Sequence, residues 1–141
     1  MITEDIYSKT NKDLLLHQYI SLGSFEDLLH RENISSEDQS LQLALIPLKH
    51  LQTFRPHYHV EHVRPMPKAQ ESWIVIRGSV QVTYYDIDNT VIAERTLMPG
   101  DATITYHGGH NYQCMSENAI VYEVKTGPYL GAKYDKAQIN S

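Results

Sequence analysis

The sequence lacks most of the features that mark secreted, membrane-spanning or nucleic-acid-binding proteins. Its 141 residues include a single cysteine, Cys114, which excludes an internal disulfide and a cysteine-rich zinc site. Its longest apolar stretches, such as residues 73–76, are far shorter than the roughly 20 residues of a membrane-spanning helix. Twelve Lys and Arg face seventeen Asp and Glu, an acidic balance that disfavours a phosphate backbone as partner. We therefore expect neither a membrane nor a nucleic-acid partner.

The first residues also lack the pattern of a targeting segment. Met1-Ile2-Thr3-Glu4-Asp5 is acidic and has no apolar run behind it, which is unlike a secretory signal or a transit peptide. A lone cysteine is typical of a reducing compartment. These features predict a cytoplasmic protein. A chain of this length can bury a sufficient core without a structural metal, so any bound metal would serve function.

The first 40 residues are the part of the chain with helical spacing. Apolar residues at positions 14, 15, 19 and 20 fall on one helical face, and Gly23 is a suitable end. Residues 24–27 resemble the start of a second short helix. We predict a short helical N-terminal extension over residues 1–40, a barrel over 41–130 and a C-terminal tail over 131–141.

From residue 41 onward the pattern is that of strands. Apolar and polar residues alternate, and turn residues such as Gly78 and Pro99-Gly100-Asp101 recur at intervals of about 8–12 residues. This spacing indicates an all-β sandwich or barrel and disfavours a parallel α/β sheet. The predicted strands cover residues 41–48, 72–76, 79–86, 91–97, 102–106, 112–115 and 119–124.

The eight histidines are grouped rather than scattered. Three lie at positions 57, 59 and 62, and two more at positions 107 and 110. In an extended segment residues i and i+2 point to the same side, so His57 and His59 can face one point. Glu71 opens the next predicted strand. Imidazoles and a carboxylate are ligands for a divalent ion with open positions, such as Fe, Mn, Ni, Co or Zn.

These residues carry a family resemblance. His57-Tyr58-His59, Glu71 with six residues before Gly78, and Pro99-Gly100-Asp101 leading to His110 resemble the two-part metal motif of the cupins. The resemblance implies a double-stranded β-helix, the cupin jelly-roll barrel. It also implies that His57, His59, Glu71 and His110 bind a divalent metal ion inside the barrel.

Three further runs narrow the resemblance. Residues 55–59, residues 84–88 and above all Glu123-Val124-Lys125-Thr126-Gly127-Pro128-Tyr129 are similar to cupins of the WbuC type, which are associated with bacterial O-antigen and capsule gene clusters. This implies a protein that acts on or binds a saccharide or nucleotide-sugar, with an isomerase-like or epimerase-like step. A metal-dependent dioxygenase and a non-enzymatic carbohydrate or metabolite sensor are the alternatives.

The ligand set has rivals within the chain. Eleven residues separate His59 from Glu71, more than cupins usually have, and they include Glu61 and His62. Either could replace Glu71 as the fourth ligand, and His107 could compete with His110.

Other residues are candidates for chemistry or binding. A tyrosine hydroxyl or a spare imidazole near the metal could move a proton, and an arginine could pair with an anionic group. Exposed strand edges and the chain ends favour a homodimer that binds a small molecule. The catalytic candidates are His62, His107, Tyr84 and Tyr112, and the substrate-binding candidates are Arg55, Arg77 and Tyr106.

Overall fold

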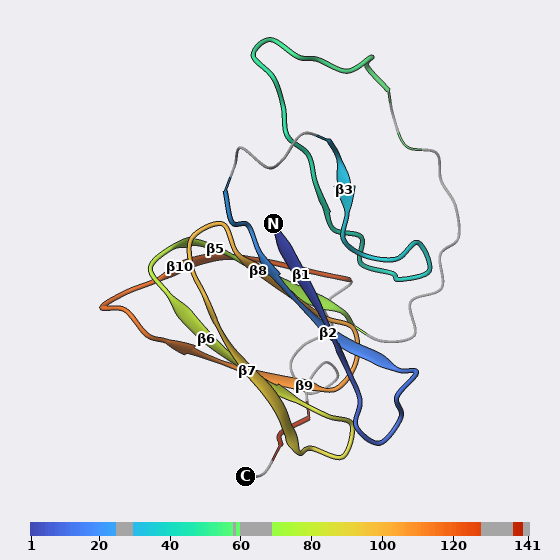
Figure 1. Cartoon of the computed structure of the whole chain (residues 1–141), viewed down its shortest axis with the longest axis vertical. Helices are drawn as coiled ribbons and strands as arrows, with labels where there is room; N and C mark the ends of the chain where they lie inside the picture. The colour runs from blue at the N-terminus through green and yellow to red at the C-terminus, as the bar shows by residue number, and fades with distance from the viewer. Residues whose placement is uncertain (25–29, 58, 60–68, 128–136, 140–141) are drawn as a thin grey trace.

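The structure of the chain, a computed structural model, consists of strands (Figure 1). It describes residues 1–24, 30–57, 59, 69–127 and 137–139. Within these residues there are ten strands and no helix, which confirms the all-β fold class. No helix long and apolar enough to cross a membrane is found in the described part of the chain. The strands are β1 (Ile2–Tyr7), β2 (Leu15–Ser21), β3 (Glu32–Asn33), β4 (Ala44–Leu45), β5 (Glu71–Arg77), β6 (Val80–Tyr85), β7 (Val91–Leu97), β8 (Ala102–Thr105), β9 (Gly109–Cys114) and β10 (Ile120–Lys125).

Two antiparallel sheets make up the main body. The larger has the strand order β1-β2-β8-β5-β10, and the smaller has the order β7-β6-β9. From β5 onward the chain crosses between the sheets, with β5, β8 and β10 in the larger sheet and β6, β7 and β9 in the smaller. These crossings bring residues of the larger sheet opposite residues of β9. The sheets of the described residues do not close into a barrel, so the jelly roll stays a prediction.

The two sheets pack against each other through their inner side chains. Val80, Val82 and Tyr84 alternate along β6 and are all buried, because every second side chain of a strand points to the same face. They form one cluster with Val75 of β5 and Leu97 of β7. Burying each such side chain contributes roughly 1.5–3 kcal/mol. This core fixes the relative position of the strands that carry the polar residues described below.

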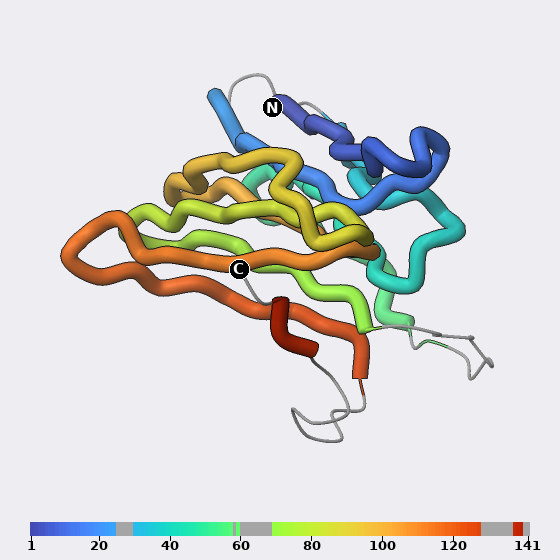
Figure 2. The backbone as a smooth tube through the Cα atoms, turned by 90° about the horizontal axis from the view of Figure 1, so that it is seen from below, coloured from blue at the N-terminus to red at the C-terminus, as the bar shows by residue number. Residues whose placement is uncertain are grey.

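The outer face of the larger sheet is also covered. Ile20 of β2 and Ile104 of β8 are buried there beside Tyr106. In Figure 2 the cyan segment that contains β3 and β4 lies beside the blue strands β1 and β2. Strands β2 and β8 are therefore buried on both faces. The side chains of the covering segment that pack on this face are Ile34, Leu41 and Leu43.

At the other edge of the larger sheet the outer face is exposed. Among the described residues strand β10 pairs with β5 alone, and Ile120, Tyr122 and Val124 are 53%, 64% and 46% exposed. The expected homodimer stays a prediction, and this exposed strip on β10 is a suitable surface for it. Light scattering of a variant with substitutions on this strip would test the prediction.

The helical N-terminal extension is wrong where the structure describes it. Residues 14–20 were expected on a helix, but Leu15–Ser21 forms β2 and pairs with both β1 and β8. A strand buried on both faces shows little apolar–polar alternation, so its pattern is easily mistaken for helical spacing. The second expected helix falls largely on residues 25–29, which lie outside the described residues.

Most strands predicted from residue 72 onward are confirmed. Strands β5 to β10 coincide with the six predicted runs to within a few residues at each end. Gly78, expected in a tight turn, has φ +78°, and a Cβ there would lie 2.3 Å from the Asn118 carbonyl oxygen. The predicted strand over residues 41–48 is largely wrong, because only Ala44–Leu45 pairs.

Candidate functional site

A row of polar side chains crosses one end of the larger sheet. In the strand register, Thr105 of β8 lies opposite His17 of β2 on one side and Glu71 of β5 on the other. Lys125 of β10 lies opposite Glu71. Because side chains at paired positions share one face, the register alone aligns these four residues.

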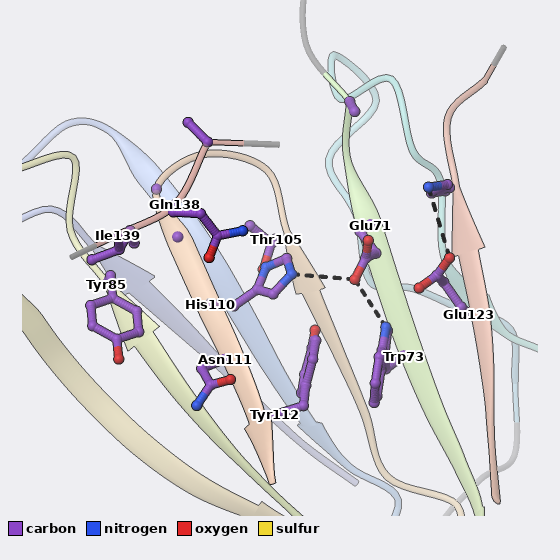
Figure 3. Close-up of a pocket in the computed structure, with 15 residues that line it drawn as sticks. Glu71, Trp73, Tyr85, Thr105, His110, Asn111, Tyr112, Glu123, Gln138 and Ile139 are labelled. Carbon is purple, nitrogen blue, oxygen red and sulfur yellow. Dashed lines mark hydrogen bonds and ion pairs between the residues drawn. The ribbon is translucent and has the colours of Figure 1, made fainter. Parts of the chain in front are cut away.

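The smaller sheet contributes the opposite wall. His110 and Tyr112 of β9 pair with Tyr84 and Val82 of the core strand β6, which fixes their position between the sheets. Together the two sheets enclose a cavity of about 600 Å³, within the range of small-molecule sites (Figure 3). The described residues lining it are Ala69, Glu71, Trp73, Tyr85, Thr105, Gly108, Gly109, His110, Asn111, Tyr112, Glu123, Lys125, Ala137, Gln138 and Ile139.

Glu71 and His110 form the polar centre of the cavity. Nε2 of His110 lies 3.3 Å from Oε1 of Glu71, and the indole N–H of Trp73 donates to the same oxygen at 2.9 Å (Figure 3). Glu71 is only 9% exposed. A carboxylate so far from water requires compensating partners, and these two contacts provide them.

An aromatic pair stands next to this centre. The rings of Trp73 and Tyr112 are stacked, with centroids 3.8 Å apart and planes inclined by 11°. Burial raises the pKa of Tyr112, and the negative charge of Glu71 raises it further, so the hydroxyl keeps its proton at neutral pH. That hydroxyl is buried and has no well-formed hydrogen bond within the described residues; a weak interaction with the Thr105 side chain lowers its pKa slightly. A buried hydroxyl whose hydrogen bond is poorly formed is available to donate to a bound acceptor atom.

The charges on the cavity wall favour a cation. Among the described lining residues, two carboxylates, Glu71 and Glu123, face a single ammonium, Lys125. The ammonium of Lys125 lies 3.9 Å from the carboxylate of Glu123. Glu123 lies at the far side of the cavity from Tyr85 (Figure 3). This pair is partly exposed to solvent, which weakens its attraction.

Part of the predicted C-terminal tail closes one side of the cavity. Gln138 and Ile139 lie on the side of Tyr85 and His110 (Figure 3). Ile139 packs so closely on Gly109 that a Cβ there would lie 2.3 Å from its Cδ1. The described tail residues are thus part of the wall rather than a free end.

Of the four predicted metal ligands, the structure brings two together. His110 and Glu71 meet in the cavity, whereas His57 and His59 lie exposed in a segment without strands. Their rings contact each other edge to face at 5.5 Å, and His57 Nδ1 lies 2.9 Å from the Arg55 carbonyl oxygen. Within the described residues, no group of three or more His, Cys, Asp or Glu side chains is placed to hold a metal ion.

The other candidates lie away from the cavity. Tyr84 is fully buried in the core, where its hydroxyl is 2.7 Å from that of Thr103. Tyr106 lies on the outer face of the larger sheet and donates to Gln18 at 2.6 Å. The described lining residues do not include His107, Arg55 or Arg77. Tyr112, in contrast, is on the wall. Glu61 and His62 lie outside the described residues.

Several site residues were not anticipated. Trp73 could have been found, because it follows Glu71 by two positions on a predicted strand and so shares its face. Glu123 and Lys125 could have been found in the same way, because they are two positions apart on β10 and so share one face. Thr105 had no signal, because a threonine in a strand is ordinary. His17 was hidden by the wrong helix assignment.

Gly108 permits the close approach of two strands behind the cavity. Its φ is +70°, and a Cβ there would lie 2.4 Å from the Tyr85 carbonyl oxygen and 3.1 Å from Nε2 of His17. We predict that Gly108→Ala lowers the free energy of unfolding by about 2–4 kcal/mol, through left-handed backbone strain and displacement of that carbonyl. Urea denaturation measures the loss.

Gly23→Ala is the matched control for this substitution. Gly23 also has positive φ, +65°, but its Cβ would come no nearer than 3.3 Å to another atom. The control should lose only the strain, about 1–2 kcal/mol. If both variants lost the same free energy of unfolding, the Tyr85 carbonyl would not lie close enough to Gly108 to exclude a methyl group.

Comparison of the chain with protein-family models, curated proteins and solved structures finds no match. The resemblance to the cupins therefore rests on the residues quoted above. What the cavity can do must follow from the chemistry of its wall.

Proposed function

We propose that the chain binds a divalent metal ion in this cavity and uses it to hold a small polar ligand. One observation supports this most directly. Nε2 of His110 and Oε1 of Glu71 face each other at 3.3 Å. Two adjacent ligands of one ion, each about 2.1 Å from it, lie about 3.0–3.5 Å apart. The spacing of the pair thus fits a metal, and the excess of carboxylates on the wall supports a cation.

His57 and His59 are proposed to complete the ligand set. The described residues supply only two ligands in the cavity, fewer than a stable site needs. The His57–His59 pair is exposed and carries two imidazoles side by side. Eleven residues join it to Glu71, a connection that spans up to about 36 Å when extended, so the chain length allows both halves to reach one ion.

The proposal also includes the jelly-roll form of the all-β fold. We take the two sheets as the halves of a cupin jelly roll, since β5 to β10 cross repeatedly between them around one core. The cavity then lies at the open end, between β5 and β9. This is where a jelly roll of the predicted kind would hold its metal.

The ligand is proposed to be a saccharide or nucleotide-sugar. Besides the metal ligands the wall presents a stacked Trp73–Tyr112 pair and the polar side chains of Asn111 and Gln138, groups that suit a ring with hydroxyls. A bound metal would polarise a ligand oxygen. Tyr112 stays protonated and can donate to that oxygen. Glu123 is the remaining described carboxylate on the wall and can accept a proton, as an isomerase-like or epimerase-like step requires.

A metal-independent site is the second candidate. Glu71 and His110 are already in contact, and the described residues bring no third ligand to them. In this case the pair would itself transfer protons to and from the ligand. Iron with oxygen consumption would instead indicate the dioxygenase, and binding without turnover would indicate the sensor.

Metal analysis of the purified chain tests the proposal. We predict one divalent ion per chain and a fall in affinity of about 100-fold or more in the His57→Ala/His59→Ala double variant, because two ligands are lost. Elemental analysis and competition with a chelator measure this. His30→Ala/His50→Ala is the control, since both are exposed histidines of the described chain.

The outcomes separate the candidates. Unchanged affinity in the His57/His59 variant, with metal bound, would remove these residues from the ligand set. A chain that binds no metal, yet shifts its His110 signals when a saccharide is added, would support the metal-independent site. Loss of affinity in the control variant would point to surface binding by histidines.

A further inference from the structure

A chain of hydrogen bonds extends from the cavity into the protein behind His110. Nδ1 of His110 lies 3.0 Å from the hydroxyl oxygen of Thr105, which lies 3.1 Å from Nδ1 of His17. Nε2 of His17 lies 3.1 Å from the carbonyl oxygen of Tyr85. The two histidines are thus joined through one hydroxyl, and the last acceptor is a backbone carbonyl.

The direction of each bond follows from its partners. A carbonyl oxygen only accepts, so Nε2 of His17 carries a proton and donates to Tyr85. His17 is fully buried, and burial lowers its pKa to about 4, so the ring is neutral and its Nδ1 has no proton. Thr105 must therefore donate its single hydroxyl proton to His17. Toward His110 the same oxygen can only accept.

We propose that His17 and Thr105 are positioning residues that hold a proton on Nδ1 of His110 and so present its Nε2 to Glu71 and the cavity. The proposal rests on the proposed function, in which Nε2 of His110 is the atom that binds the metal. A ring nitrogen binds a metal only when it is unprotonated, and the bond made by the other nitrogen decides which one that is.

The location of the two residues suits this role. Both are on the inner face of the larger sheet, His17 on β2 and Thr105 on β8, at paired positions. Strand β8 lies between β2 and β5, and its residues 102–105 are all buried. The His17 ring also packs against Tyr84 with centroids 4.8 Å apart. The hydroxyl that orients His110 therefore belongs to a central strand that is buried along its whole length (Figure 3 shows Thr105 behind His110).

A merely structural role would give a different picture. A histidine that only fills space needs one hydrogen bond at each nitrogen, to any partner. Here the partner of His17 on the cavity side is the one hydroxyl that also touches His110. The Tyr85 carbonyl thus fixes the proton position in His17, which fixes the direction of the Thr105 hydroxyl, which in turn accepts from Nδ1 of His110.

Thr105→Val and Thr105→Ser form the matched pair that tests this inference. Valine keeps the shape and removes the hydroxyl, whereas serine keeps the hydroxyl. In the wild type, ¹⁵N NMR of the histidine rings should show a proton on Nδ1 of His110. Thr105→Val removes the acceptor of that proton, so Nδ1 should lose it while Nε2 donates to Glu71, and divalent-metal affinity should weaken by about 10–100-fold. Thr105→Ser should restore both.

His17→Phe provides an independent variant. The phenyl ring keeps a similar shape but presents no nitrogen that accepts from Thr105. Thr105 then becomes free to donate to Nδ1 of His110, so the proton of the neutral His110 ring would lie on Nε2. We expect this tautomer shift together with reduced metal affinity, in a variant whose thermal unfolding confirms that it is folded.

The measurements distinguish failure of this inference from failure of the proposed function. A wild type that binds no metal would sink the metal proposal, while the tautomer of His110 and its response to Thr105→Val would still test the positioning role. A wild type that binds metal through His110, with an unchanged tautomer and affinity in Thr105→Val, would overturn the positioning role alone.

Discussion

His110→Ala and Glu71→Gln are each expected to lower the affinity for a divalent ion by at least about 100-fold, equivalent to about 2.8 kcal/mol of binding free energy. His110 presents Nε2 and Glu71 presents Oε1 to the same point, 3.3 Å apart. Removing either leaves one strong ligand in the described cavity. Isothermal titration with Zn²⁺ or Mn²⁺, or competition with a chelator, measures the loss.

The two substitutions differ in their effect on the fold. Glu71→Gln is nearly isosteric and keeps an oxygen to accept from the indole N–H of Trp73, so it should change stability little. His110→Ala leaves the Glu71 carboxylate, 9% exposed, without its imidazole partner and should lower the thermal midpoint. Glu71→Gln therefore tests what the carboxylate charge contributes to metal binding with little change in stability. His110→Ala tests the contribution of the imidazole, and its loss of stability must be measured alongside.

Glu123→Gln is the control for both substitutions. Glu123 lies on the same cavity wall and carries the same charge, but it forms an ion pair with Lys125 rather than with His110. It should lose less than about tenfold in metal affinity, the size of a screened long-range charge effect. An equal loss in all three variants would mean that the cavity attracts cations by net charge alone and that Glu71 and His110 are not ligands.

The sequence predicts strands well where one face is polar. Strands β6 and β7 alternate in this way, and the glycine between β5 and β6 has the positive φ that its turn requires. Glu71 and His110 were predicted as ligands because their spacing from Gly78 and from the Pro99-Gly100-Asp101 turn resembles the cupin motif. Their meeting could not be deduced from alternation, since it depends on which strands cross between the sheets.

Prediction fails where tertiary packing decides the conformation. Strand β2 is covered on both faces, by the smaller sheet and by the segment with β3 and β4, so its apolar residues do not alternate. The error concealed His17, whose role depends entirely on Thr105 and Tyr85, residues 88 and 68 positions away. The spacing of His57 and His59 predicts a shared direction, and their rings do lie together, but spacing carries no information about the distance to Glu71.

Tyr84→Ala is expected to lower the free energy of unfolding by about 3–5 kcal/mol and the thermal midpoint by about 10–20 °C. Tyr84 is fully buried at the contact between the sheets, among Val75, Val82 and Leu97. Replacing its ring with a methyl group leaves a cavity that the two hydrogen-bonded sheets cannot close by moving together. Such a loss is a large share of the 5–15 kcal/mol of a typical domain.

Two variants divide this effect into its parts. Thr103 donates its hydroxyl proton to the Gln18 carbonyl, so Tyr84 is the donor to Thr103; Tyr84→Phe removes only this bond and should cost about 1 kcal/mol. Tyr7→Ala, at a 46% exposed tyrosine of β1, should cost less than about 1 kcal/mol.

Because Tyr84 also pairs with His110 in the β6–β9 register and touches the His17 ring, Tyr84→Ala should weaken metal binding as well, whereas Tyr84→Phe should preserve it. Urea denaturation and metal titration of the three variants test this; a Tyr84→Ala chain within 1 kcal/mol of wild type would show that the sheets are not held together through this ring.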